Sequence, residues 1–242
     1  MINSIQDVTK FINDKSFKKI FLLCGKNSFV NSGAENLFSR NIDKNNIKFF
    51  FKISKIPNLD ELIEIIKEIK IFKPDLILAI GGGAIIDYAK IANLVDDRPD
   101  IADLIINYSY PLKNKNAKLA VIPTTAGSGA EVTSNAVMYV NGIKYSFESE
   151  LLIPDYFFLV PEFLISAPNN IKASSGFDAL AQALESLVSK KSNSKSIDYA
   201  SKSIKISLDS FISFLNNPSF KNASEMSIAS NLAGKAINIS KT

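Results

Sequence analysis

Two glycine-rich segments each follow a short apolar run and carry groups that could bind a phosphate. Gly81, Gly82 and Gly83 end the run "LILAIGGG" and precede an apparent helix that begins near Ala84. Glycine permits close approach of the backbone, and the positive end of the helix points to the same place. A tight turn between a strand and a helix would explain the glycines equally well, and the segment is not the GxGxxG dinucleotide pattern.

The second segment, "PTTAGSGAEVT", offers hydroxyl groups beside two further glycines. Its candidates are Thr124, Thr125, Ser128 and Thr133. Hydroxyls and bare backbone in one loop suit phosphate or ribose oxygens, although a polar surface loop would have the same composition. Because ligands of open α/β sheets bind at the carboxyl ends of strands, the two segments together predict a nucleotide site.

A third candidate lies in "SSGFDALAQALESLVS". Asp178 and Gln182 are four residues apart, so a helix would present both on one face, as two-point metal coordination requires. An amide oxygen binds zinc or ferrous iron more weakly than imidazole, so Gln182 could instead hydrogen-bond water or substrate. The structural alternative is a helix capped at Gly176, whose dipole stabilises Asp178. Glu185 shares this face and could equally pair with a lysine.

The lack of histidine and the single cysteine limit the mechanisms that the chain could support. The chain has no histidine, so a mechanism that needs imidazole must obtain it elsewhere. Cys24, the single cysteine, lies in the apolar run "KIFLLCG", where we expect a buried thiol and a reducing, cytoplasmic setting. The first residues lack the pattern of a signal peptide, and no apolar run reaches membrane-spanning length.

The hydrophobic pattern predicts an α/β fold with a mostly parallel sheet. Four apolar runs bounded by Gly or Pro read as buried strands, at 18–25, 46–53, 75–83 and 117–125. A helical period over 58–72 between the second and third runs indicates a βαβ arrangement. Asn141-Gly142 between two β-rich runs predicts a hairpin over 136–147.

Helical patterns then take over, at 174–190, 194–215 and 223–239. We therefore predict a Rossmann-like nucleotide-binding domain over 1–165 and an all-helical domain over 166–242, which looks incomplete. Apolar faces on the last two helices should then be exposed and promote association. Their residues are Ile204, Leu208 and Ile212, and Ile228, Leu232 and Ile237.

Composition supports a globular chain without a nucleic-acid surface. Of the 242 residues, 46% are hydrophobic and 21% charged, which is enough for a substantial core. The net charge of +4 comes from scattered lysines rather than a basic block. We expect neither a nucleic-acid nor a membrane partner.

Four segments in order resemble the iron-containing alcohol dehydrogenase family over nearly the whole chain. They are "GGGAIIDYAK", "PTTAGSGAEVTSNAV", "SSGFDALAQALES" and "IASNLAGKAINIS". The resemblance implies an oxidoreductase that uses NADP or NAD and a divalent metal, iron or zinc. It also implies a small aldehyde or alcohol substrate and a homodimer or higher oligomer. The "DALAQALES" region is most similar to the branch that reduces phosphonoacetaldehyde and related small phosphonate aldehydes.

The resemblance also assigns roles by position. Gly81, Gly82 and Gly83 would face the cofactor diphosphate. Thr124, Thr125 and Ser128 would contact adenine and phosphate, with Thr133 nearer the nicotinamide. Asp87 could face the nicotinamide or substrate, although a surface ion pair would also explain it. Lys90, Asn58 and Lys144 match positions near the cofactor.

Cofactor preference depends on the residues after the first strand. Relatives that prefer NAD often carry a carboxylate there, whereas this chain has Gly25 and Lys26. Without the carboxylate a 2′-phosphate is not repelled, and Lys26 could attract it, so we expect NADP. An ordinary lysine in an exposed turn is the alternative.

The metal site departs from the family. Relatives use an Asp and commonly a His one turn later, with two further His downstream; here Asp178 is kept and Gln182 replaces the first His. We expect the intact enzyme to bind the metal with ligands beyond this chain, which could be a fragment. The alternatives are a non-redox lyase similar to 3-dehydroquinate synthase and a non-catalytic nucleotide-binding module.

Overall fold

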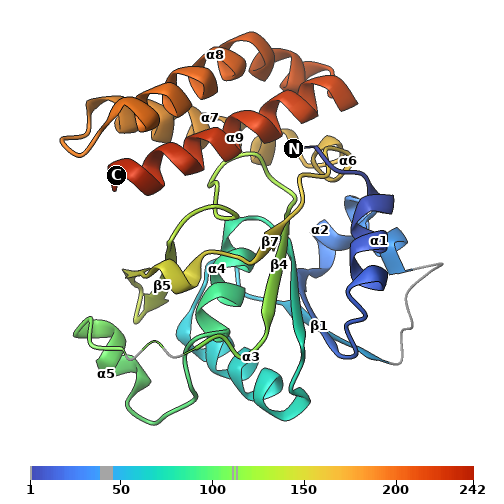
Figure 1. The fold of residues 1–242 in the computed structure, drawn as a ribbon, viewed down its shortest axis with the longest axis vertical. Helices are drawn as coiled ribbons and strands as arrows, with labels where there is room; N and C mark the ends of the chain where they lie inside the picture. Colours follow the sequence, from blue (N-terminus) through green and yellow to red (C-terminus); the bar gives the residue numbers. More distant parts are fainter. Residues whose placement is uncertain (1, 39–45, 111, 113) are drawn as a thin grey trace.

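A five-stranded parallel sheet forms the centre of the protein, seen in a computed structural model that describes residues 2–38, 46–110, 112 and 114–242 (Figure 1). Its strand order is β2-β1-β3-β4-β7, and every neighbouring pair is parallel. The strands are β1 (Ile20–Gly25), β2 (Ile47–Lys52), β3 (Leu76–Gly81), β4 (Lys118–Pro123) and β7 (Tyr156–Phe157). The first four confirm the predicted strands, although β2 lies at the edge of the sheet and is partly exposed rather than buried. The short edge strand β7 was not expected.

Helices cover both faces of this sheet, as its nearly continuous apolar strands require. Alternate side chains such as Phe21 and Ile77 pack on one face against α3 (Leu59–Phe72), α4 (Gly83–Ala92) and α5 (Ile101–Ile106). The side chains between them, Leu22 and Cys24 among them, pack against α1 (Ile5–Asp14) and α2 (Lys26–Asn31). The Cys24 thiol is fully buried, as predicted, and burial raises its pKa to about 12.

The helix predicted over 58–72 is α3, and its ends follow from local chemistry. The Asn58 side chain accepts a hydrogen bond from the Glu61 N–H (3.0 Å), which caps the first turn. Lys73 ends the helix in the left-handed conformation, with φ of 50°. Leu62, Ile65, Ile66 and Ile69 form its buried face.

The predicted hairpin consists of β5 (Asn135–Val140) and β6 (Ile143–Glu148), paired antiparallel. Asn141 and Gly142 both have positive φ, 52° and 78°. These are the angles of the type I′ turn that the Asn-Gly pair predicted. The hairpin lies beside α4 and α5, outside the parallel sheet (Figure 1).

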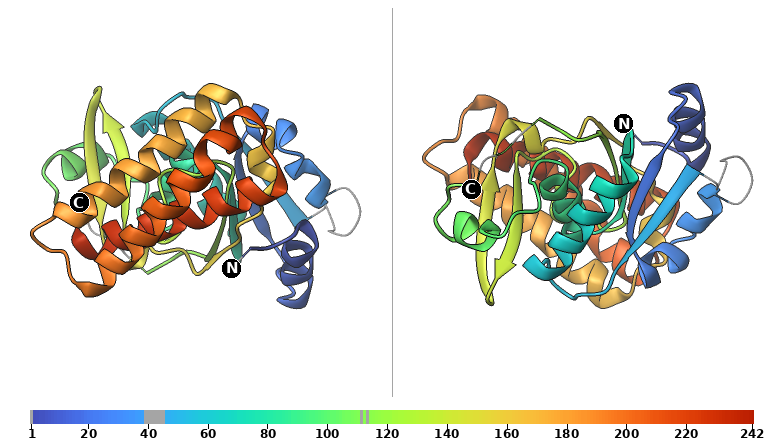
Figure 2. Two further views of the ribbon diagram at one scale, coloured as in Figure 1. Left: turned by 90° about the horizontal axis from the view of Figure 1, so that it is seen from above. Right: turned by 90° about the horizontal axis from the view of Figure 1, so that it is seen from below.

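The last part of the chain forms a helical layer over the carboxyl ends of the strands (Figure 1). After α6 (Glu162–Ile165) come α7 (Asn169–Val188), α8 (Ser194–Asn216) and α9 (Phe220–Ser240). Viewed from above, these three long helices run side by side across the molecule (Figure 2). No helix in the described part of the chain is long and apolar enough to cross a membrane.

Two expectations about these helices are wrong. Helix α7 begins at Asn169 directly after Pro168, so Gly176 lies inside the helix rather than at its N-cap. A Cβ at Gly176 would lie 2.3 Å from the Phe211 ring of α8, so close packing of the two helices explains this glycine.

The apolar face predicted for the last helix is mostly covered, because α9 packs against α7 and α8 and against the loop at Gly129. Leu232 and Ile237 are each 8% exposed. On α8 the expectation holds for Leu208 and Ile212, which are 68% and 65% exposed, but Ile204 is partly buried against the other helices.

Candidate functional site

The two glycine-rich turns lie side by side, as the sequence led us to expect. The Thr124 N–H donates a hydrogen bond to the Gly81 carbonyl oxygen (3.0 Å), which joins the ends of β3 and β4. A Cβ at Gly82 would lie 3.3 Å from Oγ1 of Thr125, and one at Gly83 would lie 2.9 Å from Oγ of Ser128. The absence of side chains at both glycines therefore lets the hydroxyl loop approach the start of α4.

The start of α4 remains open to an anion. Gly82 is the N-cap residue and supplies no side-chain cap. The first N–H groups of an α-helix have no partner within the helix, and they form the positive end of its dipole. Backbone donors and neighbouring hydroxyls at one strand end are the arrangement that binds a diphosphate.

Two adjoining cavities lie at this edge of the sheet, about 270 and 320 Å³ in volume. Both are lined by Ser28, Gly82, Thr125 and Ile171. The first extends toward Thr124 and the start of α7, and the second toward the ends of β1 and β2. Together they form a cleft between the sheet and the helical layer, which is where an open α/β sheet binds its ligand.

The structure divides the predicted cofactor residues into three groups. Gly25, Gly82, Gly83, Thr124 and Thr125 line the cleft, with Gly81 and Ser128 directly behind them. Lys26 and Lys144 are exposed and line neither cavity. The side chains of Asn58, Lys90 and Thr133 instead form hydrogen bonds with other groups of the protein.

Lys90 and Thr133 belong to a buried polar cluster behind the cleft. The Lys90 ammonium donates to Oγ1 of Thr133 (3.0 Å) and to the carbonyl oxygens of Thr133 (2.8 Å) and Asn135 (3.0 Å). Burial lowers the pKa of Lys90 to about 8, although nearby Asp87 and Glu131 oppose the shift. These contacts hold α4 against the loop before the hairpin. This structural role explains why Lys90 and Thr133 are present without any contact to a ligand.

Asp87 lies on α4 close to this cluster and is partly buried. Burial raises the pKa of its carboxyl group to about 6, and the charges of Lys90 and Lys144 oppose this shift. A carboxyl group with such a pKa can gain or lose a proton near neutral pH. Asp87 lines neither cavity of the cleft, so its catalytic role stays a prediction.

Glu131 is a buried carboxylate that the sequence analysis did not single out. The Asn231 amide of α9 donates to its Oε1 atom (2.9 Å). Burial raises the pKa of Glu131, while Lys90 and Lys235 oppose the shift. Glu131 therefore links the hydroxyl-rich loop to α9 through a hydrogen bond that needs no cofactor.

Asp178 and Gln182 lie next to each other on α7, as their spacing predicted. The Gln182 amide nitrogen donates to Oδ2 of Asp178 (3.0 Å), and the Gln182 Oε1 atom is buried without a hydrogen-bond partner. Desolvation raises the pKa of Asp178, and nearby Glu185 adds to the shift.

One carboxylate and one amide do not make a metal site by themselves, because protein zinc sites use at least three side chains. Within the described residues, no three or more His, Cys, Asp and Glu side chains are grouped to hold a metal ion. The family's metal would need ligands beyond the residues that the structure describes.

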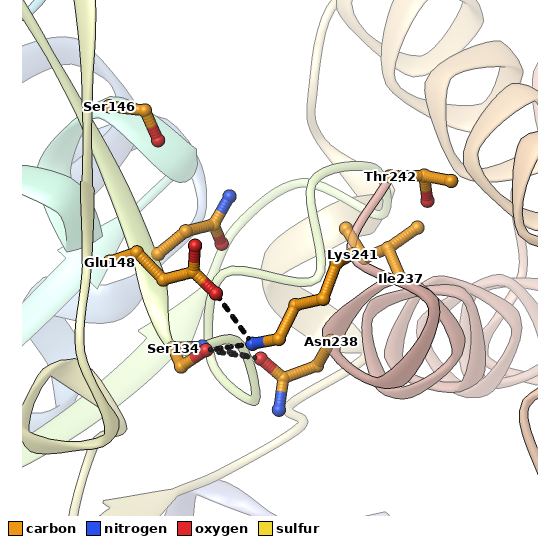
Figure 3. Close-up of a pocket in the computed structure, with 8 residues that line it drawn as sticks. Ser134, Ser146, Glu148, Ile237, Asn238, Lys241 and Thr242 are labelled. Atoms are coloured by element: carbon orange, nitrogen blue, oxygen red, sulfur yellow. Dashed lines mark hydrogen bonds and ion pairs between the residues drawn. The ribbon is translucent and has the colours of Figure 1, made fainter. Parts of the chain in front are cut away.

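A separate cavity of about 180 Å³ lies between the hairpin and the end of α9 (Figure 3). Lys241 pairs with Glu148 (2.8 Å) and donates to Oγ of Ser134 (3.1 Å), and Ser134 in turn donates to Oδ1 of Asn238. Four of the polar groups that line it thus already bind one another. These contacts fasten the hairpin to α9 and do not resemble a ligand site.

The family profile of iron-containing alcohol dehydrogenases matches residues 2–161. The chain belongs to this family. It is 33% identical over 177 residues to the aldehyde-alcohol dehydrogenase of Streptococcus pneumoniae, covering 68% of this chain and 20% of that protein. It is also 33% identical to the 4-hydroxybutyrate dehydrogenase of Clostridium kluyveri over 242 residues, which covers 95% of this chain and 63% of that one.

Solved iron-containing alcohol dehydrogenases have the same fold. The sulfoacetaldehyde reductase of Bifidobacterium kashiwanohense, solved in complex with NAD⁺, superposes with a TM-score of 0.90 at 26% identity. The match covers 100% of this chain and 65% of that structure. The chain thus spans less than two thirds of these relatives.

Several cleft residues were missed by the sequence analysis. Lys52, Ser28, Ser174 and Ser175 line the second cavity. Lys52 ends a predicted strand, so the rule that pointed to the glycine turns could have found it. The serines line the cleft only through the packing of α2 and α7, which no local pattern shows.

Proposed function

We propose that this member of the iron-containing alcohol dehydrogenase family is a nicotinamide-dependent, metal-assisted reductase of short aldehydes. The single observation that carries the proposal is the contact between the two turns at Gly82 and Thr125, beside an uncapped helix start. In this proposal the N–H groups of Gly82 and Gly83 and the hydroxyl of Thr125 bind the cofactor diphosphate. The nicotinamide extends along the cleft beneath α7.

Asp87 is proposed to exchange a proton close to the reacting end of the cofactor. Its pKa of about 6 supports this role, as does its position near Lys90 and Lys144. Asp178 is proposed as one metal ligand and Gln182 as its neighbour. No step is assigned to the metal, because two side chains do not form its site.

For the substrate we propose a short aldehyde with an anionic group at its other end, such as a small phosphonate aldehyde. Two relatives support this class by name, since 4-hydroxybutyrate and sulfoacetaldehyde both carry an anionic group. Lys144 is an exposed cation whose charge acts on both Asp87 and Asp178. It could therefore attract such a group toward the cleft.

The test is aldehyde-dependent oxidation of NADH and NADPH by the purified protein, supplied with Fe²⁺ or Zn²⁺. The panel pairs each anionic aldehyde with a neutral aldehyde of equal length. Faster turnover of the anionic members supports the proposal, and equal rates would reject the substrate class. Absence of cofactor binding would reject the dehydrogenase proposal itself.

The incomplete set of metal ligands favours a second candidate, a nucleotide-binding module without turnover. This candidate predicts NAD(P)H binding but no aldehyde reduction at any metal concentration. Reduction that requires added metal would exclude it.

A further inference from the structure

The carboxyl ends of β1 and β2 meet in the second cavity of the cleft. Gly25 and Lys52 are directly paired in the parallel register of these strands. Both line the 320 Å³ cavity together with Gly82 and Gly83. The Lys52 side chain therefore faces the space that continues from the proposed diphosphate position.

Lys52 is held in place by the loop that follows it. Its ammonium group donates hydrogen bonds to the carbonyl oxygens of Ser54 and Lys55, the latter at 3.2 Å. An ammonium group has three N–H donors, so one remains for a ligand.

That loop is itself fixed by a buried polar cluster. The Glu61 carboxylate accepts hydrogen bonds from the N–H groups of Ile53 (2.5 Å) and Ser54 (3.3 Å). The Tyr88 hydroxyl donates to Glu61 (2.9 Å) and accepts from the Asn58 N–H (2.7 Å). Because Tyr88 is fully buried, the carbonyl groups that hold Lys52 have a rigid support.

The positive charge of Lys52 is not neutralised by an ion pair within the described residues. Glu61 is close enough to raise the pKa of Lys52, but desolvation outweighs it and lowers that pKa. The Glu61 oxygens are already used by the loop. A partly desolvated cation without an ion-pair partner binds an anion more strongly than an exposed lysine would.

We propose that Lys52 binds the 2′-phosphate of the cofactor ribose and so gives the protein a preference for NADPH over NADH. This inference rests on the proposed nicotinamide-binding function and adds a residue that determines specificity. Gly25 supports it, because no carboxylate stands at that strand end to repel the phosphate. Lys26, the residue expected from the sequence, is exposed and lines neither cavity.

The test measures binding of NADPH and NADH, by nicotinamide fluorescence, to the wild type and to three alanine variants. Lys52→Ala removes the proposed contact, and Lys26→Ala tests the alternative lysine. Lys48→Ala is the matched control, since Lys48 lies on the same strand but pairs with Glu68. Thermal melts verify that each variant folds.

We expect Lys52→Ala to weaken NADPH binding about tenfold while NADH binding changes less than about twofold. The wild-type preference for NADPH should decrease as salt is raised, because the contact is between charges. Competition by adenosine 2′,5′-bisphosphate should exceed that by AMP only when Lys52 is present.

Three results would overturn the inference while leaving the proposed function intact. They are equal binding of NADH and NADPH by the wild type, an equal loss of both in Lys52→Ala, and an NADPH-specific loss in Lys26→Ala instead. An equal loss of both cofactors would assign Lys52 to the shared diphosphate. If the wild type binds neither cofactor, the proposed function and this inference both fail.

Discussion

At the scale of single residues, burial changes the pKa values of two groups on α4. Asp87 and Lys90 are ordinary helix residues in the sequence, separated by one turn of α4. Burial brings the pKa of Asp87 up to about 6 and that of Lys90 down to about 8. The two groups therefore titrate near neutral pH in a chain that has no histidine.

Asp87→Asn should remove a pH dependence of stability. The folded-state pKa of Asp87 lies above its ordinary value of 3.8. The folded state therefore retains the Asp87 proton more tightly, and this contribution to stability is lost as pH rises from about 4 to about 6. We expect urea denaturation curves of the variant to show a smaller decrease in unfolding free energy over that range.

Asp209→Asn, on the exposed face of α8, is the control and should follow the wild type. Asparagine at position 87 can still accept a hydrogen bond from the Val137 backbone, so the substitution mainly removes the charge. Identical pH profiles for wild type and Asp87→Asn would contradict the assigned pKa.

Gln182→His should create a stronger pair of metal ligands on α7. Imidazole binds zinc and ferrous iron better than an amide, and Asp178 lies one turn away. We expect affinity for Co²⁺, followed by its visible absorption, to rise at least about tenfold over that of the wild type. Gln182→Leu is the control, and equal affinities of His and Leu variants would show that position 182 does not face a metal.

At the scale of elements, the hydroxyl-rich loop is positioned by contact with the helical layer. Gly129 has φ of 59°, and a Cβ there would lie 2.4 Å from the Gly234 Cα of α9. Gly127 approaches Ser175 of α7 in the same way, at 2.8 Å. The loop that lines the cleft is therefore clamped between two helices.

Gly129→Ala tests this clamp, with Gly142→Ala as a control of similar backbone angle. Gly142 also has positive φ, but a Cβ there would meet nothing within 4 Å. Both variants incur the penalty of a left-handed conformation, about 1–2 kcal/mol. Gly129→Ala should lose about 1–3 kcal/mol more unfolding free energy than Gly142→Ala, because the backbone of α9 at Gly234 or the loop itself must move to make room for the Cβ.

Chemical denaturation of both variants measures the two unfolding free energies that are compared. Gly129→Ala should also weaken NADPH binding, since the displaced loop carries Thr124 and Thr125. Equal destabilisation by the two substitutions would mean that the loop and α9 separate without cost.

At the scale of the whole molecule, several large apolar side chains of α7 and α8 are exposed. Phe177, Leu184 and Val188 of α7 are exposed, as are Leu208 and Ile212 of α8. Leu208 and Ile212 lie one turn apart on the same face of α8, and grouped apolar side chains on a surface favour contacts with another protein surface. We therefore expect the 242-residue chain to self-associate through this face of α8.

Replacing both Leu208 and Ile212 with Lys should shift the protein toward monomer in sedimentation velocity experiments over a range of concentrations. The two residues are one turn apart on the same face, so two charges there would oppose burial of the patch. Leu151→Lys, at an exposed apolar position outside α7, α8 and α9, is the control. Unchanged association in the double variant would place the contact elsewhere.

The sequence by itself determined the elements whose signals are local. Short apolar runs bounded by Gly or Pro located β1 to β4, a helical period located α3, and Asn141-Gly142 specified the hairpin turn, because backbone preference and side-chain spacing act within a few residues. The strand ends at Gly81 and Pro123 also located the cleft, since parallel strands place their carboxyl ends together.

Tertiary structure alone decided which residues face that cleft and which are used internally. Lys90 and Thr133 carried the same family signal as Thr125, yet they hydrogen-bond to each other in the buried core, 43 residues apart in the chain. The sequence suggested Gly176 as a helix cap. In the structure, a side chain at this position would collide with the Phe211 ring. Contacts between distant segments also placed Lys52 rather than Lys26 in the cavity, because its orientation depends on a loop fixed by Glu61 and Tyr88.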